Sequence, residues 1–288
     1  MKPATRMLVL LALMGVGLLL ASVIHLILLH ISDSMLAMLV LQGILVFMVP
    51  AIVAMAIFYR RPLHEMYLDR APSWMALLLV LAFAVLSLPA MNWLVHANEA
   101  MKLPSWMGGI EQWMRQAEDA AALATKQLLD IHTISELIVT TLVVGFIAGL
   151  GEETLFRGAM LRTLQDSRLG THAVVWIVAI VFSAFHLQFY GFIPRMVLGL
   201  WLGYLLVWSR SLWVPIIAHT LNNSTVIVFS YLTNKGVVPE GYGDQLGIPA
   251  EGAFPWLAIA SAVASILLAV CAAQYFKRRT AVSDQPSA

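Results

Sequence analysis

The sequence predicts an all-α protein, a polytopic transmembrane helical bundle of about eight helices. Of its 288 residues, 60% are hydrophobic and only 11% are charged, and the mean hydropathy is +0.84. Soluble domains are on average about half apolar and a quarter charged, so a water-soluble fold of this length could not bury so much apolar surface. Lipid is the alternative solvent, and transmembrane helices satisfy their own backbone polar groups within it.

Eight apolar segments recur along the chain, and each has, or can be extended to, about 17–25 residues, the length that crosses a bilayer. They are Met7–Leu29, Met35–Phe58, Trp74–Val95, Leu137–Leu150, Ala173–Phe189, Met196–Val207, Leu212–Tyr231 and Pro255–Phe276. The first is longer than the apolar part of a typical signal peptide, so we interpret it as a span and keep a cleavable signal as the alternative. The sixth is the shortest.

The placement of lysine and arginine predicts the orientation in the membrane. Twelve of the 17 fall on one side of the eight-span topology and five on the other, and the positively charged side is the cytoplasmic one. We therefore expect a multi-pass integral protein of a bacterial plasma membrane, with cytoplasmic N- and C-termini. The net charge of +1 argues against a nucleic-acid partner. The single cysteine, Cys271, excludes a disulfide framework or a cysteine-based zinc site.

Three polar clusters interrupt the apolar pattern, all in the C-terminal half. The first contains Glu152, Glu153 and Arg157, after the fourth segment. Glu153 and Arg157 are four residues apart, in the order that favours a helical ion pair, whereas Glu152 points about 100° away around the helix. A buried carboxylate without a partner suits a general base or acid. The alternative is that the span ends at Leu150 and that the three charges are solvated.

The second cluster is Phe182 and His186 in the fifth segment, and the third is His219 and Asn223 in the seventh. Packing or interhelical hydrogen bonding is the alternative to a functional role for each. At 1.5 Å per residue, the clusters lie roughly 10–22 Å from the cytoplasmic helix ends, so one pocket could contain a carboxylate, two imidazoles and a carboxamide. These groups can activate water and stabilise an oxyanion, the two requirements of peptide hydrolysis.

The three clusters resemble the motifs of the CAAX protease and bacteriocin-processing family (CPBP) of intramembrane endopeptidases. The family pattern is Glu-Glu-x-x-x-Arg, then Phe-x-x-x-His, then His-x-x-x-Asn or Asp, and all three occur here in that order. The segments Leu198–Tyr204 and Ser211–Pro215 also look like the family's linking helix. The resemblance covers roughly Leu137–Ser230, about a third of the chain.

The resemblance implies an intramembrane endopeptidase that hydrolyses a peptide bond of a membrane-associated protein or peptide. Glu152 would activate the attacking water beside His186, while His219 and Asn223 would polarise the scissile carbonyl, with Asn223 as the oxyanion donor. The supporting residues would be Glu153, Arg157 and Phe182. Related proteins cleave prenylated C-terminal tails, mature peptides or act in bacteriocin immunity, and nothing in the sequence selects among these substrates.

The need for a metal stays open. Glu152, His186 and His219 could form a zinc site with an open fourth position, yet the His-Glu-x-x-His helix of zinc proteases is absent. We favour a glutamate-type enzyme without a cofactor and keep a zinc metalloendopeptidase as the alternative. A second class of function is a polytopic transporter or membrane scaffold with a buried Glu/His/Arg cluster. We find no inverted repeat of the kind that transporters show, so we favour the enzyme.

These expectations divide the chain into three parts. Residues 1–134 hold N-terminal transmembrane helices and an extracytoplasmic amphipathic segment, residues 135–276 form a protease-like transmembrane core, and residues 277–288 form a cytoplasmic tail. The amphipathic segment lies in the longest polar stretch, Ala97–Ile134. Its apolar residues recur every three or four positions, at Ile110, Trp113, Met114, Ala117 and Ala121. This spacing predicts a helix that either rests on the membrane surface or covers the bundle.

Overall fold

The computed structural model describes residues 1–28 and 35–283, and within these ranges every regular element is a helix. The expected all-helical fold is therefore confirmed. Among the described residues, six helices are long and apolar enough to cross a membrane: Pro3–Leu28, Met35–Phe58, Trp74–Glu99, Ile134–Gln165, Phe189–Ser209 and Trp256–Arg278. The expected end of the first span at Leu29 and the last part of the expected tail, 284–288, lie outside the described residues.

Two of the eight expected spans fall short of that length and composition. Helix α10 (Thr171–Phe185) has 15 residues, which reach only about 22 Å at 1.5 Å per residue. Helix α12 (Trp213–Asn234) has 22 residues, but polar side chains interrupt it, and it is not among the helices apolar enough to cross a membrane. The expected number of about eight spans is thus not confirmed. The sixth expected span, the shortest in sequence, extends to 21 residues in the structure.

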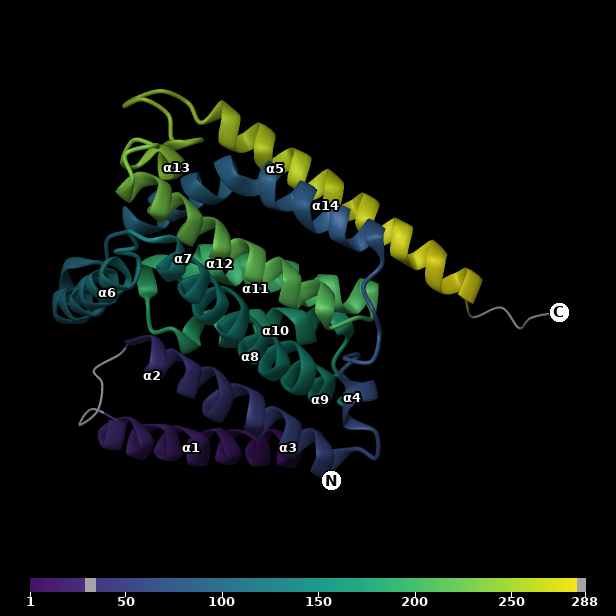
Figure 1. Cartoon of the computed structure of the whole chain (residues 1–288). Coiled ribbons are helices and arrows are strands. Elements are labelled where there is room, and N and C mark those ends of the chain that lie inside the picture. The colour runs from purple at the N-terminus through teal and green to yellow at the C-terminus, as the bar shows by residue number, and fades with distance from the viewer. Residues whose placement is uncertain (29–34, 284–288) are drawn as a thin grey trace.

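The helices form a layered bundle with its two pairs of outer helices at opposite edges (Figure 1). One edge consists of α1 (Pro3–Leu28) packed against a continuous helix of three parts: α2 (Met35–Leu41), η1 (Gln42–Met48) and α3 (Val49–Phe58). The other edge consists of α5 (Trp74–Glu99) packed along α14 (Trp256–Ser283). The short helices α4 (Pro62–Glu65) and α13 (Tyr242–Gln245) lie in the connections.

The middle of the bundle contains α10, α11 (Phe192–Ser209), α12 and a second long composite helix. The parts of that helix are α7 (Ile134–Thr140), η3 (Thr141–Ile147), α8 (Ala148–Glu153), η4 (Thr154–Leu161) and α9 (Arg162–Gln165). The stretches η1, η3 and η4 are π-helical, and such wide turns, which shift the direction of the side chains, are frequent at functional sites. Two of them flank α8, the element that carries the two neighbouring glutamates.

The predicted amphipathic segment forms η2 (Ser105–Met107) and α6 (Gly108–Leu128), which lie at one end of the bundle (Figure 1). The carboxylate of Glu118 accepts a hydrogen bond from the backbone N–H of Tyr190 at 3.3 Å, and the ring of Trp113 lies 5.2 Å from that of Phe189. Helix α6 therefore covers the short 3₁₀ turn η5 (Phe189–Gly191) that leads into α11. Trp106 and the outer face of α6 stay exposed.

An ionic cluster joins three elements at the opposite end of the bundle. The guanidinium of Arg6 donates hydrogen bonds to the Tyr59 hydroxyl at 3.0 Å and to the Asp166 carboxylate at 2.6 Å. The Tyr59 hydroxyl itself donates to Asp166 at 2.7 Å, and Arg162 donates to the same carboxylate. Burial and the hydrogen bond to Asp166 raise the pKa of Tyr59 to about 12, so the phenol keeps its proton and remains a donor. The cluster connects the start of α1 to the ends of α3 and α9.

Candidate active site

Glu153 and Arg157 form a completely buried ion pair. The Arg157 guanidinium donates to the Glu153 carboxylate at 2.7 Å, and both side chains are 0% exposed. The same guanidinium donates to the carbonyl oxygen of Gly199 at 3.0 Å and lies 4.4 Å above the ring of Phe182. The predicted pair is therefore present, and the alternative of a span that ends at Leu150 with three solvated charges is wrong. The pair joins the composite helix to α10 and α11, so its loss would leave an uncompensated buried charge.

His219 is attached to this ion pair from the neighbouring helix α12. Its Nδ1–H donates to Glu153 Oε1 at 2.8 Å, and the residue is only 4% exposed. Because a carboxylate is only an acceptor, this contact assigns the ring proton to Nδ1. Glu153 thus orients an imidazole as well as neutralising an arginine, a link that spacing along the sequence could not show.

Glu152 faces the two imidazole rings. Its Oε2 lies 4.0 Å from Nε2 of His186 and 3.8 Å from Nε2 of His219, and this oxygen is buried with no hydrogen-bond partner in the described part of the chain. His186 Nδ1 donates to the carbonyl oxygen of Phe182 at 2.9 Å, so Nε2 of the neutral ring carries a lone pair. Three acceptors therefore converge at distances too long for direct hydrogen bonds. A small hydrogen-bond donor such as water fits between them.

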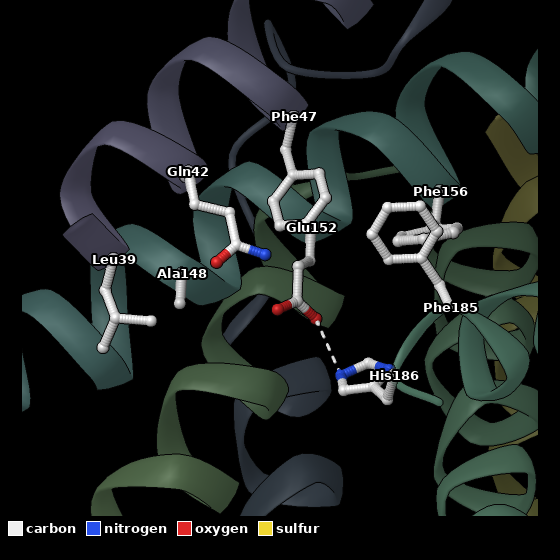
Figure 2. A pocket seen from close by; sticks show the side chains of 9 residues that line it. Leu39, Gln42, Phe47, Ala148, Glu152, Phe156, Phe185 and His186 are labelled. Carbon is white, nitrogen blue, oxygen red and sulfur yellow. Dashed lines mark ion pairs between the residues drawn. The ribbon is translucent and has the colours of Figure 1, made fainter. Parts of the chain in front are cut away.

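A cavity of about 290 Å³ opens beside Glu152 and His186. Its walls are formed by Leu39, Gln42, Gly43, Phe47, Ala148, Glu152, Phe156, Phe185 and His186. Figure 2 shows the Glu152 carboxylate and the His186 ring pointing into the same space, with apolar side chains around them. This volume is close to the lower end of the range for ligand pockets, about 300 Å³, so the cavity has room for only a short piece of a peptide chain.

Asn223 lies one helical turn from His219 on the same face of α12, as its spacing predicted. Its amide nitrogen donates to the carbonyl oxygen of Val144 at 3.1 Å, and its oxygen accepts from Asn222 at 3.3 Å. A carboxamide nitrogen has two hydrogens, so one remains for another acceptor. Of the four predicted catalytic residues, the structure brings Glu152, His186 and His219 to one point and places Asn223 beside His219, away from the cavity wall.

Glu152, His186 and His219 are residue types that bind zinc, but their side chains are spaced too widely to hold it. In both histidines Nδ1 is fixed by an acceptor and Nε2 faces the glutamate, as in ligands of zinc. Zinc bonds of about 2.0–2.1 Å hold neighbouring ligand atoms roughly 3.3 Å apart, however, and the separations here are 3.8 and 4.0 Å. Within residues 1–28 and 35–283, no three His, Cys, Asp or Glu side chains are arranged to hold a metal ion. Glu152, His186 and His219 would have to draw together to bind zinc.

Several cavity residues were absent from the sequence prediction, and the most polar of them is Gln42. It comes from η1, in the N-terminal half, where no motif was found. The aromatic side chains Phe47, Phe156 and Phe185 carry no sequence signal that separates them from other core residues. Gln42 does carry one, because a carboxamide within the otherwise apolar run Met35–Phe58 is costly in a membrane.

Comparison with known proteins points to one family. Residues 134–225 match the family described as type II CAAX prenyl endopeptidase Rce1-like, and this stretch contains all three predicted motifs. The chain is also similar to the uncharacterized protein YpbD of Bacillus subtilis (strain 168), with 30% identity over 98 residues. The match covers 33% of this chain and 45% of that relative's length. No solved structure matches the chain.

Proposed function

We propose that the protein is an intramembrane endopeptidase, on the basis that residues 134–225 match the family described as type II CAAX prenyl endopeptidase Rce1-like. Its substrate is a membrane-associated protein or peptide, in which it hydrolyses one peptide bond. The observation that supports this most directly is the buried Oε2 of Glu152, which has no hydrogen-bond partner among the described residues and faces two imidazole nitrogens at the edge of a cavity.

In the proposed mechanism, Glu152 is the general base. A water molecule between Glu152 and His186 donates one hydrogen bond to the carboxylate and one to Nε2 of the ring, so its oxygen lone pair is directed at the substrate. Attack forms a bond from the water oxygen to the scissile carbonyl carbon, and the proton passes to Glu152. The hydrogen bond from His186 to the Phe182 carbonyl keeps Nε2 free for this water.

The proposed oxyanion site lies on α12. As the carbonyl oxygen becomes negative, it would accept from the second hydrogen of the Asn223 amide, beside His219, which Glu153 holds in place. Because the ring proton of His219 lies on Nδ1, the amide is the donor here, and such a donor stabilises the tetrahedral intermediate once the substrate carbonyl extends from the cavity toward α12. When the carbon–nitrogen bond breaks, Glu152 returns its proton to the leaving nitrogen, which completes the hydrolysis without a metal.

The test of this function is cleavage by purified full-length protein in lipid nanodiscs. The probes are two internally quenched peptides of identical sequence, one with a farnesylated cysteine followed by three residues and one without the prenyl group. We expect cleavage by the wild type and a loss of at least about 10²-fold in the Glu152→Gln variant, because the general base is removed.

The matched control is Glu251→Gln, the same substitution at an exposed glutamate outside the spans, which should cleave like the wild type. Equal rates in the Glu152→Gln and wild-type proteins would refute the role of Glu152. A wild-type protein that cleaves neither peptide, nor any peptide of a membrane extract, would refute the endopeptidase and favour the transporter or scaffold.

A further inference from the structure

Gln42 connects the N-terminal helices to the site, although it lies outside the segment that matches the family. It stands at the start of the π-helical stretch η1 and forms part of the cavity wall together with Glu152 and His186. Figure 2 shows its carboxamide directed toward the space in front of the Glu152 carboxylate. These three residues provide the polar side chains of a wall that is otherwise apolar.

A close approach of two backbones explains how Gln42 reaches this position. A Cβ atom on Gly151 would lie 2.6 Å from the carbonyl oxygen of Gly43, a separation that real side chains do not adopt. The two glycines therefore allow η1 and α8 to touch backbone to backbone. The residues next to them in sequence, Gln42 and Glu152, consequently share one cavity.

The Gln42 carboxamide has no hydrogen-bond partner within residues 1–28 and 35–283. An unsatisfied amide is destabilising when it is buried away from water, and in a membrane span a polar group usually serves a function. A carboxamide offers both a donor and an acceptor, the same pair of groups that a peptide unit offers. Its position next to the general base thus suits a contact with a peptide main chain.

We propose that Gln42 is a substrate-binding residue, whose carboxamide hydrogen-bonds the peptide main chain beside the scissile bond. This inference rests on the proposed endopeptidase function and deepens it, because it assigns part of the substrate site to the N-terminal helices. Gln42 would act on binding rather than on the proton transfer, since the structure contains no hydrogen bond between it and Glu152.

The experiment separates binding from cleavage by using full-length Glu152→Gln protein in nanodiscs. The probe is the farnesylated peptide with a fluorescent label, and its affinity is measured by anisotropy. Adding Gln42→Leu should weaken binding about tenfold, the effect of one or two lost hydrogen bonds. Gln42→Met, closer to glutamine in shape, should do the same. The control is Gln274→Leu, the same substitution at an exposed position of α14, which should leave the affinity unchanged.

A second measurement uses the otherwise wild-type enzyme. Gln42→Leu should raise KM about tenfold, change kcat less than about twofold and leave the pH profile of kcat in place. Equal peptide affinity in the Gln42 variants and their parent would overturn the inference, while cleavage by the wild type would leave the proposed function intact. A shifted pH profile with unchanged affinity would also overturn it, because Gln42 would then act on Glu152. A wild-type protein that neither binds this peptide nor cleaves any peptide of a membrane extract would overturn both proposals.

Discussion

Glu152 and Glu153 are adjacent in sequence but occupy opposite environments. Glu153 accepts from an arginine and a histidine and is 0% exposed, whereas Oε2 of Glu152 has no partner in the described part of the chain. The difference follows from the rotation of about 100° between neighbours on a helix, which turns one carboxylate toward Arg157 and the other toward the cavity. The same rotation underlies the different roles that we predict for them.

Substitution by glutamine should separate these roles. Glu153→Gln leaves the Arg157 charge buried without its partner, which should cost about 3–5 kcal/mol of folding free energy and lower the melting temperature and yield. Glu152→Gln removes no hydrogen bond of the fold and should melt within a few degrees of the wild type while losing activity. Thermal unfolding of both proteins in nanodiscs checks this. A Glu152→Gln protein that unfolds more readily than Glu153→Gln would contradict the assignment.

Asn223→Ala tests the oxyanion site. Loss of one such donor should lower kcat about 10²–10³-fold with little change in KM, because the donor acts mainly on the charge that develops in the transition state. Steady-state kinetics with the quenched peptide measure both constants. Gln274→Ala, which removes an exposed carboxamide on α14, is the control, and an equal loss in both variants would argue against a specific oxyanion donor.

Activity in the presence of a chelator distinguishes a glutamate-type enzyme from a zinc enzyme. A glutamate-type enzyme should keep its activity after dialysis against a strong chelator, because Glu152 takes the proton from water itself. A zinc enzyme would lose its activity and regain it when zinc is added. Elemental analysis of the active protein, combined with the assay in chelator, decides between them. Stoichiometric zinc with chelator-sensitive turnover would establish the metalloprotease.

At the level of the helices, glycines set the distance between α1 and its neighbour. A Cβ atom on Gly17 would clash with the carbonyl oxygen of Leu45 in η1, whereas a Cβ on Gly15 would have nothing within 4 Å. Packing between membrane helices depends on such small residues, which allow the backbones to approach. Along most of its length, α1 is therefore held by close van der Waals packing of the helices and not by polar contacts.

A pair of matched substitutions checks this packing. Gly17→Ala should destabilise the protein by about 1–3 kcal/mol, the usual effect of overpacking. Gly15→Ala should be neutral or slightly stabilising, since alanine is the better helix former. Intrinsic tryptophan fluorescence during thermal unfolding gives both values. If the two variants melt at the same temperature, α1 does not pack on η1 through Gly17.

Most helices could be predicted from the sequence because apolar runs of membrane length are unambiguous. The sequence could not show that α10 would end at Phe185, before the expected Phe189, because Leu187 and Phe189 still continue an apolar run that His186 and Gln188 only interrupt. It could not show the π-helical stretches either, since they depend on packing of side chains around α8. The i,i+4 pair of Glu153 and Arg157 was predictable from spacing alone, whereas its contact with His219 depends on tertiary structure.

For the whole molecule, orientation in the membrane remains a prediction from charge. The start of α1 and the end of α14 lie at one end of the bundle and α6 at the other (Figure 1), as an even number of crossings requires. Reporter fusions after Lys277 and within Ala97–Ile134 should therefore report opposite sides, with the Lys277 fusion in the cytoplasm. Two fusions on the same side would contradict the topology.

Part of the site comes from residues that belong to no motif. All three motifs lie within the segment that matches the family, and they identified the residues that meet around Glu152. The cavity, however, is closed by Leu39, Gln42 and Phe47 from the first part of the chain. No motif in the first 134 residues pointed to them, and only Gln42 carried a signal, as a carboxamide within an apolar run. Their place in the site depends on how two helices pack.

The shortness of α10 has a consequence for the surrounding lipid. The hydrocarbon layer is about 30 Å thick, whereas the 15 residues of this helix reach about 22 Å. A bilayer responds to a helix that is too short by thinning around it, and His186 follows directly after the last residue of α10. Headgroups and the water that hydrates them would thereby be drawn toward the imidazole. A reaction that consumes water inside a membrane would then receive its water through a locally thinned region of one leaflet, without a permanent channel through the protein.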